Sequence, residues 1–140
     1  MRRIFWDTML FAYWLEGNSG QQARVQHIHG KMLAQGDELC ASLFVMSEIL
    51  VGPVKLGDSK GIALIEDFFS SPEITLLPYT LESARIFAQL RKDGIKPVDA
   101  IHLATAASSG VDLFLTNDRR LHSVSVPGIK FIASLDTDLF

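Results

Sequence analysis

Short apolar runs alternate with longer amphipathic segments along the chain, and this alternation restricts the fold more than any other feature. The short runs fit buried strands, whereas the longer segments repeat their apolar residues at helical spacing. This alternation is typical of a parallel sheet that is covered by helices on both faces. The sequence therefore predicts an α/β fold with three layers, in which a central five-stranded parallel sheet lies between helices.

Five apolar runs are predicted as strands. They are Arg3–Trp6, Leu39–Ala41, Ile74–Leu77, Leu113–Leu115 and Ile129–Ile132. With 140 residues, of which 48% are apolar, the chain has the usual length of one domain and enough material for a real core. We therefore expect residues 1–140 to form a single domain.

Several residues mark the ends of the predicted helices. Ser19 and Gln22 have the spacing of a capping box, and Gly36 supplies the left-handed residue that closes a helix. Pro97 is suited to the first turn of another helix, where proline is tolerated. The pair Gly52–Pro53 is interpreted as a turn.

Charge and cysteine content exclude several classes of protein. With 13 basic and 16 acidic residues the net charge is −3, so any contact with nucleic acid must be local. Cys40 is the single cysteine, which favours a reducing compartment. Asp7 and Glu16 interrupt the apolar N-terminal stretch, and no uncharged run reaches the roughly 18 residues of a membrane span. We expect a soluble cytoplasmic protein without membrane contact.

Four acidic residues fall where a parallel sheet places its ligands, beyond the carboxyl ends of the strands. Asp7 lies immediately after a predicted strand and Asp118 just past another, whereas Glu48 lies about two turns into a helix and Asp99 lies in the first turn of a further helix. Taken singly, each has a structural explanation as a helix cap or a solvated side chain. Glu48 and Asp99 are embedded in apolar stretches, where an unpaired charge is costly, so the four together favour a cation site.

At these acids the chain resembles the PIN-domain family, and most closely its bacterial toxin branch, the VapC-like endoribonucleases. The resemblance rests on Phe5–Thr8, Ser47–Gly52, Val98–Ala106 and Leu115–Leu121. It implies a PIN-like fold, Mg²⁺ or Mn²⁺ held by the four acids, and hydrolysis of RNA phosphodiester bonds. It also implies a homodimer and a small antitoxin partner.

Residues near the four acids are assigned supporting roles. We expect Thr8, Thr116 and Asn117 to hydrogen-bond the carboxylates or the waters of a metal. Lys92, Lys96, Arg119 and Arg120 place positive charge near the site and are expected to contact RNA phosphates, or else to form a solvated rim.

His102 leaves two interpretations open. It lies three residues after Asp99 and either contacts the substrate or is a buried histidine with a local hydrogen bond.

Three alternatives to a toxin nuclease remain open. The first is a housekeeping PIN nuclease in RNA processing, and the second is a non-catalytic binding module in which the acids hold a structural ion. The third is a phosphoryl-transfer domain with Asp7 as nucleophile. The third ranks lowest because no second Asp follows Asp7 at a distance of two residues.

Overall fold

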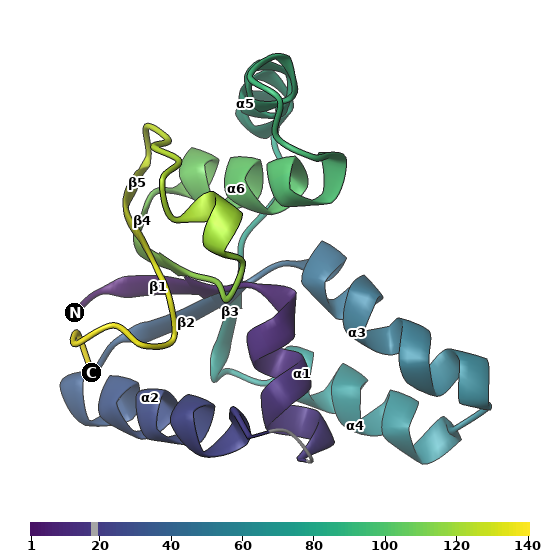
Figure 1. Ribbon diagram of the computed structural model, residues 1–140. Coiled ribbons are helices and arrows are strands. Elements are labelled where there is room, and N and C mark those ends of the chain that lie inside the picture. Colours follow the sequence, from purple (N-terminus) through teal and green to yellow (C-terminus); the bar gives the residue numbers. More distant parts are fainter. Residues whose placement is uncertain (18–19) are drawn as a thin grey trace.

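A parallel sheet forms the centre of the computed structural model, which describes residues 1–17 and 20–140 (Figure 1). Among these residues the sheet has five strands in the order β3-β2-β1-β4-β5, and every neighbouring pair is parallel. They are β1 (Arg3–Trp6), β2 (Glu38–Ala41), β3 (Ile74–Leu76), β4 (Val111–Leu115) and β5 (Ile129–Ala133). Each lies on one of the apolar runs, so the predicted sheet is confirmed.

Helices cover both faces of the sheet, which confirms the three-layer architecture (Figure 1). On one face lie α1 (Thr8–Glu16), α2 (Gln22–Gln35), α3 (Leu43–Leu56) and α4 (Ser59–Phe69). On the other lie α5 (Leu81–Lys92) and α6 (Pro97–Ser109), and a 3-10 turn, η1 (Arg119–Leu121), connects β4 to β5. In the part of the chain that the structure describes, none of the helices has the length and apolar character needed to cross a membrane.

The central strands are almost completely buried, which fixes the positions of the residues that follow them. Phe5 and Trp6 in β1 and Phe114 in β4 have no exposed surface, and the rings of Phe5 and Phe114 stack with centroids 5.1 Å apart. Cys40 in β2 is also buried, and burial raises the pKa of its thiol to about 12. Cys40 therefore acts as a small core residue and not as a reactive thiol.

The interpretation of Gly52–Pro53 as a turn is wrong, because α3 continues through both residues to Leu56. A proline ring normally clashes with the Cβ of the preceding residue when that residue is helical, but Gly52 has no Cβ. The helix ends one turn later at Gly57, whose φ of 64° lies in the left-handed region. The predicted capping box at Ser19 lies outside the described residues.

Candidate active site

The chain changes direction within the sheet between β1 and β4. From β1 it proceeds to β2 and β3 on one side, whereas from β4 it proceeds to β5 on the other. Diverging connections of this kind leave a crevice beyond the carboxyl ends of the two strands. Asp7 follows β1 and its backbone N–H donates to the carbonyl of Leu115, the last residue of β4, at 3.0 Å. The ends of both central strands therefore open into one crevice.

The four predicted acids line one pocket of about 330 Å³ in this crevice, and each comes from a different element. Asp7 caps α1, Glu48 lies in α3, Asp99 is in the first turn of α6, and Asp118 caps η1. Their side chains are between 14% and 29% exposed, so all four remain accessible from the pocket.

Hydrogen bonds from neighbouring residues fix Asp7. The Thr116 hydroxyl donates to Asp7 Oδ2 at 2.7 Å, and the backbone N–H of Thr8 donates to Oδ1 at 2.8 Å. Thr116 is buried, and its oxygen also accepts the backbone N–H of Asp118 at 3.1 Å. One threonine therefore connects the carboxylates that follow β1 and β4.

Glu48 is held by two side chains from other helices. His102 Nε2 donates to Glu48 Oε1 at 2.6 Å, and the Thr8 hydroxyl donates to the same oxygen at 2.5 Å. Burial raises the pKa of Glu48, but the hydrogen bonds from His102 and Thr8 outweigh burial and hold this pKa below its usual range. Glu48 is therefore an ionised carboxylate at neutral pH.

Asp99 has the opposite electrostatic environment. Burial and the negative charges of Asp118 and Asp7 raise the pKa of Asp99, and the positive charge of Arg120 offsets only part of this effect. Like charges that share a site destabilise one another unless a cation lies between them. The raised pKa of Asp99 therefore reflects first its burial and then the repulsion that Asp118 and Asp7 exert on it.

Arg120 is bound to the acids by a pair of hydrogen bonds. Its Nε and Nη2 atoms donate to the two carboxylate oxygens of Asp118 at 3.0 and 2.7 Å, and Nη2 lies 3.9 Å from Asp99 Oδ2. The hydrogen bond with Arg120 lowers the pKa of Asp118. The guanidinium therefore already acts as a cation between two of the acids.

The other residues with predicted supporting roles differ in how they relate to the four acids. Lys96 precedes α6, and its charge contributes to the lowered pKa of Asp118, whereas Lys92 lies exposed at the end of α5 and does not line the pocket. Arg119 is exposed and forms no ion pair within residues 1–17 and 20–140. Asn117 lines the pocket, but its amide donates to the Tyr13 hydroxyl at 3.2 Å and not to a carboxylate.

Two residues that line the pocket, His102 and Tyr13, were not predicted as site residues from the sequence. His102 is the partner of Glu48, and its position three residues after Asp99 was a usable signal, because residues at i and i+3 share a helix face. Tyr13 is the sixth residue of α1, and nothing in its sequence position marked it as a site residue. Both contacts join elements that are distant in the sequence.

The donor atoms in the pocket suit a hard divalent cation. The four carboxylates present oxygen ligands, which Mg²⁺ and Mn²⁺ prefer, and the raised pKa of Asp99 indicates repulsion that a cation would relieve. Within the described residues, no three Asp, Glu, His or Cys side chains are already grouped as a metal site. The fit of the four acids to a divalent ion therefore rests on the type of their ligand atoms.

The fold and the pocket together define a parallel α/β domain with a carboxylate-lined crevice at the carboxyl edge of its sheet. The PIN-domain family model matches residues 4–127, and the chain belongs to this family. A comparison with curated protein sequences gave no significant match.

Similar solved structures cover almost the whole chain. VapBC from Salmonella typhimurium, bound to DNA, is 22% identical with a TM-score of 0.73, and the match covers 96% of this chain and 99% of that one. VapBC2 from Rickettsia felis, bound to a DNA fragment from its promoter, is 14% identical with a TM-score of 0.71, covering 94% and 98%. VapC20 from Mycobacterium tuberculosis, described as a toxin that cleaves the sarcin-ricin loop, is 16% identical with a TM-score of 0.66, covering 89% and 98%. These structures show that the chain has the fold of VapC toxins.

Proposed function

We propose that this chain is a divalent-metal-dependent endoribonuclease and the toxin of a type II toxin–antitoxin pair. The observation that carries the proposal is the convergence of Asp7, Glu48, Asp99 and Asp118 on one pocket at the carboxyl ends of β1 and β4. Membership of the PIN-domain family supports it, and so does the description of a similar toxin as cleaving the sarcin-ricin loop. A housekeeping PIN nuclease would share the chemistry and differ in its partners.

The chain's own residues would divide the work of hydrolysis. Asp7, Asp99 and Asp118 would hold Mg²⁺ or Mn²⁺, and Glu48 would share in binding and orient the attacking water. When bound, such ions supply a nucleophilic water at neutral pH and offset the charge that develops on the phosphate. Thr116 keeps Asp7 in place, and the hydrogen bonds from His102 and Thr8 hold Glu48 in its ionised form.

Direct cleavage tests the proposal. Purified protein with Mg²⁺ is expected to cut a single-stranded RNA internally, as seen on a denaturing gel, and an Asp7→Asn protein purified in parallel is expected to leave the RNA intact. The paired preparation excludes a contaminating ribonuclease, because both proteins follow the same purification. Binding of Mg²⁺ without cleavage of any RNA would instead support the non-catalytic module.

Arg119 is expected to contact RNA phosphates, because it is exposed and has no partner among the described acids. Arg119→Ala is expected to weaken RNA binding a few-fold and to reduce the slope of log affinity against log salt by about 0.7, the value for one phosphate contact on a single strand. Measurements in an Asp7→Asn background prevent cleavage during the titration.

The matched control for Arg119 is Lys60→Ala. This change also removes one positive charge, but Lys60 is an exposed residue at the start of α4 and does not line the acidic pocket. Equal slopes for the Arg119 and Lys60 variants would show that Arg119 is only part of a solvated rim.

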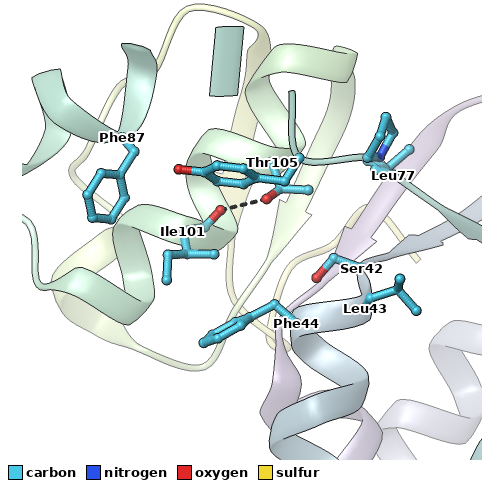
Figure 2. Close-up of a pocket in the computed structure, with 9 residues that line it drawn as sticks. Ser42, Leu43, Phe44, Leu77, Phe87, Ile101 and Thr105 are labelled. Atoms are coloured by element: carbon cyan, nitrogen blue, oxygen red, sulfur yellow. Dashed lines mark hydrogen bonds between the residues drawn. The ribbon is translucent and has the colours of Figure 1, made fainter. Parts of the chain in front are cut away.

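Two exposed apolar surfaces support the proposed partners, a second copy of the chain and a small antitoxin. Leu56 and Leu64 are 83% and 70% exposed and line a pocket of about 380 Å³ between α1, α3 and α4. Leu43 and Tyr79 line a second apolar pocket, of about 420 Å³, between the start of α3 and α6 (Figure 2). Exposed apolar patches of this kind mark interaction sites.

The proposed partners have their own test. Light scattering on the purified chain is expected to give twice the mass of one chain, and expression with a neighbouring small reading frame is expected to yield a larger complex. The proposal places the activity in the cytoplasm, where RNA is available and the single cysteine stays reduced.

A further inference from the structure

His102 is fixed inside the protein next to the acidic pocket. It lies on α6 with only 2% of its surface exposed, and its ring is 6.2 Å from the Phe5 ring and 5.4 Å from the Phe44 ring. Phe44 also lines the apolar pocket shown in Figure 2, and so does Ile101, which precedes His102 in α6. The imidazole therefore lies in the wall between the acidic and the apolar pockets, and its burial leaves almost no surface for contact with RNA.

The hydrogen bonds of His102 are unevenly distributed. Nε2 lies 2.6 Å from Glu48 Oε1, and because an ionised carboxylate only accepts, Nε2 must carry the hydrogen. Nδ1 is buried and has no hydrogen-bond partner among the described residues. A buried nitrogen without a partner reduces stability, so a histidine here is a poorer core residue than a leucine of similar volume.

Both donors to Glu48 act on the same oxygen. The Thr8 hydroxyl donates to Oε1 at 2.5 Å, and the hydroxyl oxygen itself lies 3.4 Å from His102 Nε2. The other oxygen, Oε2, has no protein donor within the described part of the chain. Two donors from different helices fix the rotation of a long, flexible side chain. They also leave one oxygen of Glu48 available in the pocket.

We infer that His102 is a positioning residue, which together with Thr8 holds Glu48 by Oε1 so that Oε2 is the oxygen presented to a divalent cation. This inference rests on the proposed function only in assuming that the acidic pocket binds a cation. Residues that orient a metal ligand in this way typically change metal affinity by about 10 to 100-fold when they are lost.

Two matched pairs of variants test the inference with Mn²⁺ alone as the probe. His102→Leu and Thr8→Val remove a donor, whereas His102→Gln and Thr8→Ser keep one. We expect His102→Leu and Thr8→Val each to weaken Mn²⁺ binding, measured by calorimetry on the full chain, by about 10-fold or more. We expect Thr8→Ser, which keeps the hydroxyl, to bind Mn²⁺ like the parent. We expect His102→Gln to stay within about 3-fold of the parent, because its amide N–H can take the place of Nε2–H.

Stability and a distant histidine provide the controls. Without metal, His102→Leu is expected to unfold close to the parent's temperature, because removal of the unpartnered buried Nδ1 offsets the loss of the hydrogen bond to Glu48. His27→Leu, on the exposed face of α2, is expected to leave Mn²⁺ binding unchanged. Equal Mn²⁺ affinity in the parent, His102→Leu and His102→Gln would overturn the inference, whether or not the parent cleaves RNA.

A spectroscopic measurement keeps the inference testable if a variant fails to fold. Nitrogen-15 NMR of the parent protein distinguishes the two ring nitrogens, and we expect the hydrogen of His102 on Nε2. A hydrogen on Nδ1 alone would overturn the inference, because Nε2 would then have no hydrogen to donate to Glu48. Failure of the parent to cut RNA, with the Mn²⁺ results as expected, would overturn the proposed function alone.

Discussion

Asp99→Asn is expected to reduce the rate of RNA cleavage by about 100-fold or more, the scale seen when electrostatic stabilisation of a transition state is lost. The amide keeps the shape of the side chain but removes one of the negative charges that attract a divalent ion to the pocket. Burial and the charges of Asp118 and Asp7 raise the pKa of Asp99, so a bound cation would stabilise the ionised form of this carboxylate. Initial rates at saturating Mg²⁺ measure the effect.

The same substitution is expected to preserve or increase stability when no metal is present. A carboxyl whose pKa is raised on folding destabilises the folded state while it is ionised. This cost is complete above the raised pKa and disappears as the pH falls below the pKa of the unfolded chain. The difference in unfolding temperature between Asp99→Asn and the parent is therefore expected to be largest at neutral pH and to shrink on acidification.

The matched control for Asp99→Asn lies on the exposed surface of α4. Asp67→Asn makes the same chemical change at an exposed position of α4 that does not line the pocket, so it is expected to cleave RNA like the parent. Full cleavage by Asp99→Asn together with a clear loss of stability would mean that Asp99 only stabilises the start of its helix, which is worth about 0.5–1 kcal/mol.

Removal of divalent ions is expected to abolish cleavage completely, and addition of Mg²⁺ or Mn²⁺ is expected to restore it. The hydrogen bonds from His102 and Thr8 hold the pKa of Glu48 low, which makes this carboxylate a weak base for the activation of water without an ion. A denaturing gel before and after treatment with a chelator measures the effect. Undiminished cleavage in the chelator would contradict the proposed mechanism.

Chelation also changes the folding of RNA, so the substrate needs its own control. A metal-independent ribonuclease added to the same chelated RNA is expected to cut it, which shows that the RNA remains accessible. In parallel, Mg²⁺ should raise the unfolding temperature of the parent more than that of Asp99→Asn, because at a given ligand concentration a ligand that binds more tightly stabilises the folded state more. Equal shifts would place the ion elsewhere in the protein.

The positions of the strands and the acids were predictable because both depend on local pattern. A parallel strand buried on both faces is a continuous apolar run; Asp7 follows one such run directly, and Asp118 lies three residues after the end of another. Since the carboxyl ends of parallel strands share one edge, convergence of the acids followed from the strand assignment. The differences between prediction and structure concern individual side chains. The Asn117 amide, for example, donates to the Tyr13 hydroxyl and not to a carboxylate.

Arg120 shows why the role of a residue is harder to predict than its position. Its place two residues after Asp118 suggested an RNA contact, but its guanidinium is paired with that same carboxylate. The distance between the two residues in sequence permits either arrangement, because a long side chain adopts many rotamers. Only the surrounding charges of the folded pocket select one of them.

The sequence by itself determined the order of strands and helices, the family, and the edge of the sheet where the acids gather, because apolar periodicity and residues at strand ends are local properties. The tertiary structure alone decided which donors hold which carboxylate. Glu48 and His102 are separated by 54 residues, and they meet only because α3 and α6 both approach the carboxyl ends of β1 and β4. A contact of 2.6 Å depends on the packing of two helices from opposite faces of the sheet, and no periodicity within either helix encodes it.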